Sequence, residues 1–342
     1  MRAGAARVGR WSRNRGIALV AVLWVIVLLA AMAISFVGTI RTETTVTRNL
    51  VDNAGAQALA DAGIYRAILA LYHSFEEVGT GGSGILAALD DEGAGTNPGE
   101  DDGGFALESG ELRFDGRPYT WPFAEGIVRF AIQSEAGKID LNAAREELLL
   151  GLLRANGVEQ PEVLIDRIAD FRDPDKERRS QGAEDNDYEN AGRNQGAKDA
   201  PFDSVEELQQ VLGVSRTLYE RLAPALTVYS EARGIDPLTA PPEALRALPE
   251  IDPSVVEALL VERQAEDPDL AGLLSEYEAY LAGPGSLVYS ISSEAVTPAG
   301  ARFRREAVIA LVPGSDRPFR VFSWKRGRLR SPQAADTEGP AD

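Results

Sequence analysis

The feature that most constrains this chain is an uncharged stretch of 24 residues, from Ile17 to Ile40. As a helix with a rise of about 1.5 Å per residue it reaches roughly 36 Å, enough to cross a hydrocarbon core about 30 Å thick. Only sixteen residues precede it, and they carry five arginines and no acid. Because cytoplasmic flanks of membrane helices are rich in basic residues, the sequence predicts a single inner-membrane span at 17–40. The N-terminus is then cytoplasmic, and everything after Arg41 lies on the far side.

A secretory signal peptide is the first competing interpretation of this N-terminus. The apolar run is longer than a typical signal core, however, and no small-x-small cleavage site precedes an obvious mature start. Gly16 instead separates the arginine-rich segment from the first apolar residue, Ile17. This arrangement resembles the class III leader of type IV pilins and pseudopilins, which a prepilin peptidase cuts after a glycine on the cytoplasmic side. The resemblance implies a cut between Gly16 and Ile17, methylation of the new N-terminus, and retention of the apolar helix.

One position narrows that resemblance. Pilins and most pseudopilins have a glutamate as the fifth residue after the cut, and here that residue is Ala21. A carboxylate inside the bilayer is tolerated only when it pairs with a neighbouring group, so a subunit with no neighbour ahead of it gains nothing from one. In lacking the acid the chain is similar to the K-type minor pseudopilin of type II secretion. A plain N-terminal membrane anchor would have nearly the same sequence.

Composition excludes several classes of function. The chain has no cysteine and one histidine, so disulfides, thiol catalysis and cysteine metal sites are impossible, and no nucleophile–base pair can be assembled. No phosphate-binding or zinc-protease motif is present. Removing the five arginines of the leader would change the net charge from −18 to −23. Such an acidic chain repels nucleic acid and is suited to hard cations. We therefore predict a protein that is not an enzyme and does not bind nucleic acid.

The pattern after the span predicts a mixed α+β fold. No proline occurs from Arg41 to Glu77, and apolar or small residues recur every three or four positions, which indicates that the first helix continues outward as a long spine. Strand patterns follow at 105–114, 127–134, 287–296, 303–312 and 318–324. Helical patterns fill the interval from Glu135 to Gly283. A helical block between strands of one small sheet indicates an insertion into an α+β domain.

The predicted organisation therefore has seven parts. They are a cleaved leader (1–16), a membrane helix (17–40), the periplasmic continuation of the spine (41–77), the first part of a sheet domain (78–135), an inserted helical domain (136–284), the second part of the sheet domain (285–330) and a disordered tail (331–342). The long N-terminal helix is expected to pack on the small antiparallel sheet, as in a pseudopilin.

A weak internal repeat lies inside the helical block. The segments around Asp140 and Asp236 share a glycine, an Ile-Asp pair and a leucine-rich stretch, and we expect Asn142 and Thr239 to cap the helices that follow. This pattern resembles the SAM-like or helix-hairpin-helix class, whose members often bind DNA. No basic patch accompanies the repeats here, so we interpret them as structural pairs.

One loop has the composition of a metal site. Between Asp166 and Glu189 the chain has nine acids and five bases. The candidate ligands are Asp170, Asp173, Asp175, Glu184, Asp187 and Glu189, with Gly182 permitting a sharp turn. Calcium takes six to eight oxygen ligands in a flexible arrangement, and acids at alternate positions are typical of that supply, although the EF-hand spacing is absent. On the residues alone, a solvated acidic loop is an equally good interpretation.

The resemblance to K-type minor pseudopilins extends over most of the chain. It rests on RGIALVAVLWV, AGAQALADAGIYRAI, SEAGKIDLNAA, GAEDNDYE, PFDSVEELQQVLGV and GIDPLTAPPEAL. It implies a pseudopilin fold with a large helical insert, calcium in that insert, processing by prepilin peptidase, and I- and J-type minor pseudopilins as partners at a pseudopilus tip. Two alternatives remain open: a membrane-anchored helix-hairpin-helix DNA-uptake protein, and a generic periplasmic adaptor.

Overall fold

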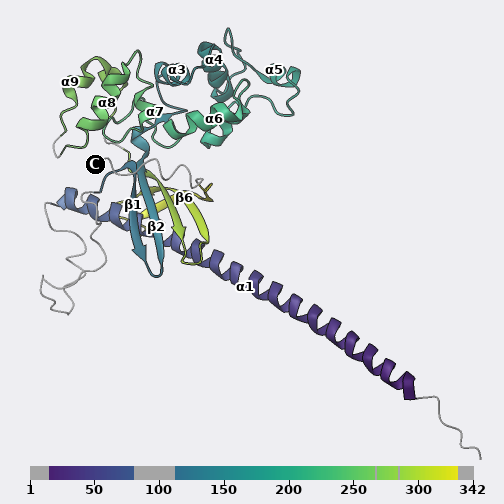
Figure 1. Ribbon diagram of the computed structural model, residues 1–342. Coiled ribbons are helices and arrows are strands. Elements are labelled where there is room, and N and C mark those ends of the chain that lie inside the picture. The colour runs from purple at the N-terminus through teal and green to yellow at the C-terminus, as the bar shows by residue number, and fades with distance from the viewer. Residues whose placement is uncertain (1–14, 81–111, 266–267, 284–285, 330–342) are drawn as a thin grey trace, which may run out of the picture. The chain divides into compact units, whose positions relative to one another are not determined.

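A computed structural model describes residues 15–80, 112–265, 268–283 and 286–329 (Figure 1). The chain divides into one unit that ends at Gly55 and another that begins at Ala56, and each is described by itself. Among the residues described, no helix is both long and apolar enough to qualify as a membrane span. The predicted span includes side chains outside the described set, at 17, 18, 34 and 36–40, and it stays a prediction.

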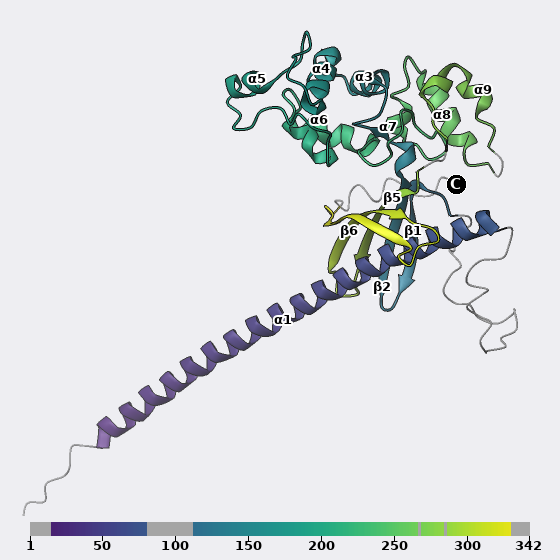
Figure 2. The same cartoon turned by 180° about the vertical axis from the view of Figure 1, so that it is seen from behind.

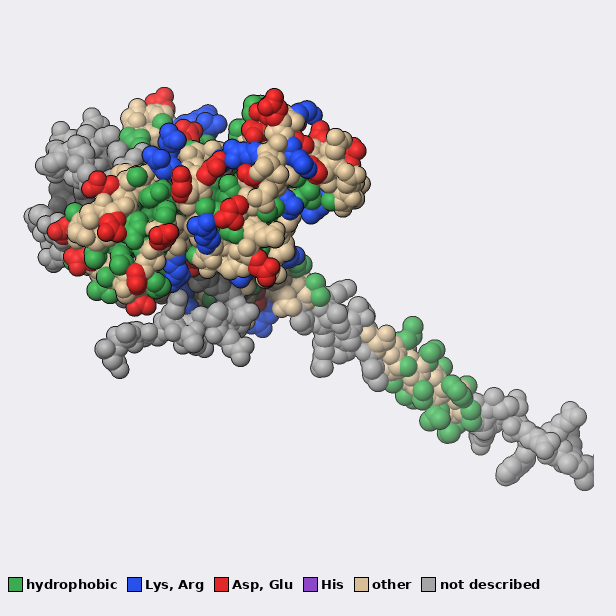
Figure 3. All heavy atoms as spheres, turned by 90° about the horizontal axis from the view of Figure 1, so that it is seen from above, with side chains coloured by type: hydrophobic (Ala, Val, Ile, Leu, Met, Phe, Trp, Pro, Cys, Tyr) green, Lys and Arg blue, Asp and Glu red, His purple; other side chains and the backbone are tan. Residues whose placement is uncertain are grey.

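The first unit consists of the beginning of helix α1 (Arg15–Thr80). Its helix is continuous over this range, as the absence of proline predicts. Apolar side chains from 19 to 33 are exposed around the helix, among them Leu19 at 73% and Trp24 at 70% (Figure 3). Val46 and Leu50, which belong to the predicted spine stripe, are also exposed. The described side chains of the first unit therefore present apolar surface.

In the second unit, the rest of α1 packs on an antiparallel five-stranded sheet (Figures 1 and 2). The strand order is β1-β2-β5-β6-β7. The strands are β1 (Asp115–Phe123), β2 (Gly126–Ser134), β5 (Val288–Val296), β6 (Arg302–Leu311) and β7 (Phe319–Arg326). Burial alternates strictly along β6, which is the period-two pattern that its sequence predicts. The observed fold is thus a mixed one of helices with an antiparallel sheet.

The core between α1 and the sheet depends on a close approach at Gly63. A Cβ added there would lie 2.2 Å from the Ser293 hydroxyl and 2.5 Å from Val128, so only glycine lets the helix reach the strands. Ile64, Ile68 and Leu71 of the predicted stripe are buried, whereas its earlier members Val46 and Leu50 are exposed. The larger side chains buried in this core are Ile64, Ile68, Leu71, Tyr119, Phe130, Ile132, Tyr289, Ile291, Ile309 and Leu311.

The prediction for the first strand, 105–114, is wrong over its last three residues. Residues 112–114 do not form a strand, 105–111 lie outside the described residues, and β1 begins at Asp115. The sequence does not predict β1 because it contains Pro118 and Pro122, and proline within a segment argues against a strand. Since β1 is an edge strand, its prolines need not donate to a second neighbour.

The helical region lies between β2 and β5, which are adjacent antiparallel strands of the same sheet. Its helices are α3 (Glu146–Ala155), α4 (Pro161–Arg172), α5 (Asp185–Asn190), α6 (Arg216–Leu222), α7 (Pro242–Leu245), α8 (Pro253–Glu262) and α9 (Ala271–Leu274). Short 3₁₀ turns are η1 (Glu135–Gly137), η2 (Val205–Gln210), η3 (Ala223–Ala225) and η4 (Ser275–Tyr280), and two short strands are β3 (Ile139–Asp140) and β4 (Leu226–Thr227). The region has its own core of leucine, isoleucine and aromatic side chains.

The internal repeat has a structural counterpart. Ile139 pairs in parallel with Leu226, and Ile235 forms a parallel bridge with Leu281, so each Ile-Asp pair joins a later extended segment. The expected caps are wrong, however. Asp140 and Asp236 themselves accept the backbone N–H groups two residues ahead, because a short carboxylate can close such a turn locally.

The two side chains that we expected to cap make other contacts. Asn142 exchanges two hydrogen bonds with the backbone of Phe202, with its Nδ2 donating to the carbonyl and its Oδ1 accepting from the N–H. The Thr239 hydroxyl donates to Asp236.

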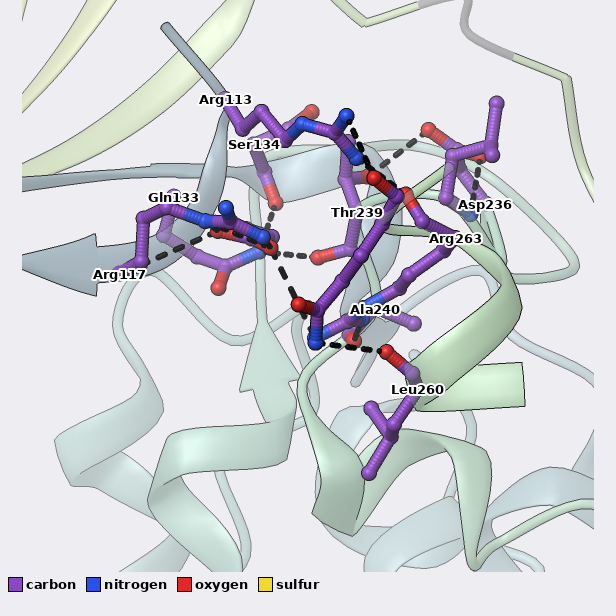
Figure 4. Close-up of polar contacts among 12 residues, drawn as sticks. Arg113, Arg117, Gln133, Ser134, Asp236, Thr239, Ala240, Leu260 and Arg263 are labelled. Carbon is purple, nitrogen blue, oxygen red and sulfur yellow. Dashed lines mark hydrogen bonds and ion pairs between the residues drawn. The ribbon is translucent and has the colours of Figure 1, made fainter. Parts of the chain in front are cut away.

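A polar junction fixes the helical region on the sheet; we define it as Arg113, Asp115, Arg117, Gln133 and Arg263 (Figure 4). Arg117 donates to both oxygens of Asp115, at 3.0 and 2.7 Å, and Arg263 lies 3.7 Å from the same carboxylate. Burial alone would raise the pKa of Asp115, but the hydrogen bonds and charge of Arg117, with Arg263, hold it below its ordinary value. This buried carboxylate is therefore fully compensated.

The junction also binds backbone carbonyls across the two parts. Arg113 donates to the carbonyls of the three residues that follow α8, 263–265. Arg263 donates to Ala240 at 2.7 Å, and Gln133 donates to Thr239 at 2.7 Å. Arg113 and Gln133 join the sheet to the helical region, and Arg263 braces the loop at Ala240, so the junction positions the helical region on the strands.

Candidate functional site

The predicted acidic loop connects α4 to α5 at the end of the helical region opposite α9 (Figures 1 and 2). Asp170 lies in the last turn of α4 and is fully buried. It accepts the backbone N–H of Arg179 at 3.2 Å, which folds the loop back over the helix. Burial is the main reason that the pKa of Asp170 is raised. Asp170 thus organises the loop as well as adding charge to it.

Gly182 is required by packing. A Cβ at this position would lie 1.8 Å from Asp170 Oδ2, which no side chain can tolerate without movement. Gly182 does not have a positive φ, so the sharp turn that we expected is not its role. The glycine lets the loop backbone press against the buried carboxylate.

Four acids surround the inner side of this loop; we call Asp170, Asp173, Glu184 and Asp199 the acidic cluster. Glu184 is 8% exposed, and in the described part of the chain neither oxygen of its carboxylate has a hydrogen-bond partner. Oδ1 of Asp173 and Oδ1 of Asp199 are likewise buried without a partner there. Buried polar atoms are normally paired, so four unsatisfied carboxylate oxygens in one loop system call for an explanation.

The electrostatics of the cluster follow from this crowding. Burial, followed by repulsion from Asp170, Asp199, Asp173 and Asp185, raises the pKa of Glu184 to about 7. Burial also raises the pKa of Asp173, with Asp175 and Asp170 adding to the shift. The cluster therefore holds more negative charge than its surroundings compensate.

The other predicted ligands lie outside the cluster. Asp175 is exposed and accepts the N–H of Glu177. Asp187 pairs with Arg178 at 3.1 Å and accepts the N–H of Glu184. Glu189 is exposed on α5.

Asp199 is the member that the sequence missed. It lies beyond the acidic loop, and no spacing or motif singles it out. Its backbone is left-handed, with φ +51°, an uncommon conformation for a residue other than glycine. Strained backbone of this kind persists where the surrounding structure holds it, and functional sites are among such places. Only the tertiary fold brings it to Glu184 and Asp173.

The residues fit a hard cation by their chemistry. As the side chains stand, no three acids or histidines within the described ranges are arranged to hold one metal ion. The unpaired oxygens nonetheless come from three separate segments, and carboxylate oxygens are the ligands that calcium prefers.

Comparisons with known proteins point to one family. The sequence profile described as type II secretion system (T2SS), protein K, matches residues 130–231, which include the acidic loop. The type II secretion system protein K of Pseudomonas aeruginosa PAO1 is 26% identical over 220 residues, covering 59% of this chain. The match covers 66% of that relative, so the chain spans just under two thirds of its length.

A solved structure is also similar. It is the crystal structure of the GspK-GspI-GspJ complex from the enterotoxigenic Escherichia coli Type 2 Secretion System, with 17% identity and a TM-score of 0.47. The similarity covers 84% of this chain and 99% of the matched chain in that complex. The profile and the curated relative thus both show that this chain is similar to the type II secretion system protein K family, the K-type minor pseudopilins.

Proposed function

We propose that this chain caps the tip of a type II secretion pseudopilus together with the I- and J-type minor pseudopilins, and so supports export of folded proteins across the outer membrane. The observation that carries the proposal is the helical region, which bears the family match and interrupts one sheet between β2 and β5. An insert of this size is too bulky to repeat along a fibre, whereas a terminal subunit can hold it. The proposed architecture is a pseudopilin fold with a SAM-like helical insert.

The anchor is part of the same proposal: one inner-membrane span at 17–40, with the bulk in the periplasm. Its support is the exposed apolar surface of the first unit, where Leu19, Trp24 and Met32 project from different sides of α1. A helix that is apolar all round is stable only when lipid or other helices cover it. Leu50 and Val51, beyond the span, are the exposed apolar positions that we propose contact a partner helix.

The role is structural, and the chain is the substrate of an enzyme rather than an enzyme itself. We propose that prepilin peptidase removes residues 1–16 and leaves Ile17 as a methylated N-terminus. Intact mass after co-expression with the peptidase measures this directly. A mature N-terminus beyond Ile40 would exclude the pseudopilin function and favour a generic periplasmic adaptor.

Assembly with the partners can be tested by co-purification. The full chain is co-expressed with the peptidase and with the I- and J-type proteins of the same system, and the complex is isolated through a tag on the J-type protein. Leu50→Glu should reduce recovery of this chain at least tenfold, because a charge then faces the partner helix. Asn49→Glu is the matched control, since it adds the same charge at the neighbouring exposed position.

Equal recovery of both variants would place the partner contact elsewhere on the chain. If no complex forms with the wild-type chain, the capping function is wrong. Binding of the chain to DNA in the same preparation would instead support the DNA-uptake alternative.

We also propose that the acidic cluster binds calcium. Bound there, a divalent cation supplies the positive charge that the four carboxylates lack, and it joins the end of α4 to the segments that hold Glu184 and Asp199. Support comes from the unpaired oxygens of Asp173, Glu184 and Asp199. Calcium would then stabilise the insert without taking part in any reaction.

A further inference from the structure

Lys176 connects two carboxylates at the border of the acidic cluster. Its Nζ lies 2.8 Å from Oδ2 of Asp185 and 3.4 Å from Oδ2 of Asp199. The other oxygen of Asp199 is one of the buried atoms that have no partner in the described part of the chain. One carboxylate thus faces an ammonium on one side and the unsatisfied interior of the cluster on the other.

The neighbouring bases are directed elsewhere. The Arg178 guanidinium pairs with Asp187 at 3.1 Å. The Arg179 guanidinium lies 2.9 Å from Glu146 and 3.8 Å from Asp166. Among the described bases of this loop, Lys176 is therefore the one whose side chain forms an ion pair with a member of the cluster.

Lys176 is also free to leave. Its side chain is 68% exposed, so moving the ammonium into water carries little desolvation penalty, and an exposed ion pair contributes little stability. A lysine is a compact cation on a flexible stem of four carbons, which allows its head to move without any backbone change. The buried oxygens of Glu184 and Asp173, by contrast, cannot be reached by water as easily.

We propose that Lys176 is a tethered counter-ion of the metal-free cluster, and that its ammonium leaves Asp199 and Asp185 when a divalent cation binds. The inference rests on the proposed calcium function of the cluster. When no metal is present, the positive charge of Lys176 partly offsets the repulsion among the carboxylates. When a cation approaches Asp199, the same positive charge repels it. Lys176 thereby raises the calcium concentration at which the site fills.

The affinity test compares two charge-removing variants. Full-length wild type, Lys176→Met and Arg178→Met, purified in detergent, are titrated with calcium chloride by calorimetry at fixed ionic strength. Lys176→Met should bind calcium roughly three- to tenfold more tightly, on the scale of one weakened ion pair. Arg178→Met removes the same charge from the same loop but should change the affinity by less than about twofold. Equal gains in both variants would reduce the effect to general electrostatics and overturn the proposal.

A second readout follows the amine itself in the wild-type chain. Exposed lysines are acetylated with an N-hydroxysuccinimide ester, with and without calcium, and each peptide is quantified by mass spectrometry. Labelling of Lys176 should rise several-fold with calcium because its ammonium is released. Lys198, which pairs with Asp203 and Glu207, is the internal control and should not change.

The outcomes separate this inference from the one on which it rests. If wild type and Lys176→Met both bind no calcium, the metal site is wrong and the displacement fails with it. If calcium binds but Lys176 labelling stays constant, the site stands and the tethered counter-ion is wrong.

Discussion

The acidic cluster and the polar junction place buried carboxylates in opposite states within one unit. At the junction, Asp115 has two arginines beside it and its pKa is lowered. In the cluster, the Glu184 carboxylate has no hydrogen-bond partner among the described residues, and its pKa is raised to about 7. Burial acts in the same direction on both, so the difference lies in compensation. The charges at the junction are compensated by the polypeptide itself, whereas the cluster keeps negative charge that its described neighbours do not compensate.

The largest expected effect on stability comes from removing the charge of Arg263 at the polar junction. Arg263→Met removes a buried charge beside Asp115 and the hydrogen bond to Ala240, so the free energy of unfolding should fall by about 3–5 kcal/mol. Urea denaturation of the full chain measures this, with exposed Arg246→Met as the control that should stay within about 0.5 kcal/mol. A loss below about 1 kcal/mol for Arg263→Met would mean that the junction does not depend on its charge.

Bound calcium should compensate the carboxylates of the acidic cluster, as the arginines compensate Asp115 at the polar junction. At a hundredfold excess over Kd, calcium stabilises the folded chain by about 2.7 kcal/mol, and chelation with EGTA removes this amount. Asp173→Asn with Asp199→Asn should abolish the response. The matched control is Asp175→Asn with Glu189→Gln, which lie outside the cluster and should leave the response intact. Equal melting temperatures with calcium and with EGTA would show that the loop is only a solvated acidic surface.

The pH dependence of stability should differ in sign between the two regions. Glu184 has a folded-state pKa of about 7, above its ordinary value of 4.5, so the folded chain binds this proton more tightly than the unfolded chain does. Its contribution is therefore fully present below about pH 4.5 and is lost as the pH rises through 7. Without metal, the free energy of unfolding should fall by roughly 2 kcal/mol between pH 5 and 7.5.

Glu184→Gln should flatten that slope, because glutamine does not titrate. For Asp115 the folded-state pKa is lowered, so its contribution is present above about pH 3.8 and is lost only as the pH falls further. Denaturant titrations in EGTA at several pH values measure both. A slope in the Glu184→Gln variant equal to that of wild type would assign the titration to another group.

The smallest expected effect concerns the glycine beside Asp170. Gly182→Ala brings a Cβ against Asp170 Oδ2 and should destabilise the chain by about 1–2 kcal/mol as the loop moves away. Gly272→Ala, in α9, meets nothing within 4 Å and should be neutral or slightly stabilising. Thermal melting distinguishes the two. If Gly182→Ala has the same melting temperature as wild type, the loop does not pack against the Asp170 carboxylate in solution.

The sequence by itself determined the elements whose patterns are local. The absence of proline and the helical spacing predicted α1, and local strand patterns predicted β2, β5, β6 and β7 with ends that differ by at most two residues. The acidic loop was also found as a region, because nine acids in one segment are visible in composition alone.

Only the tertiary structure decided which residues act together. Of the six predicted ligands, Asp170, Asp173 and Glu184 turn inward, while Asp199 joins them from a segment that carries no signal of its own. The tertiary structure also placed a proline-containing strand, β1, at the sheet edge. It showed that the carboxylates of Asp140 and Asp236, and not the expected caps, accept the backbone N–H groups of the local turns. The physical reason is range: periodicity and capping act over a few residues, whereas the burial and repulsion that define a carboxylate's state depend on neighbours that are distant in the chain.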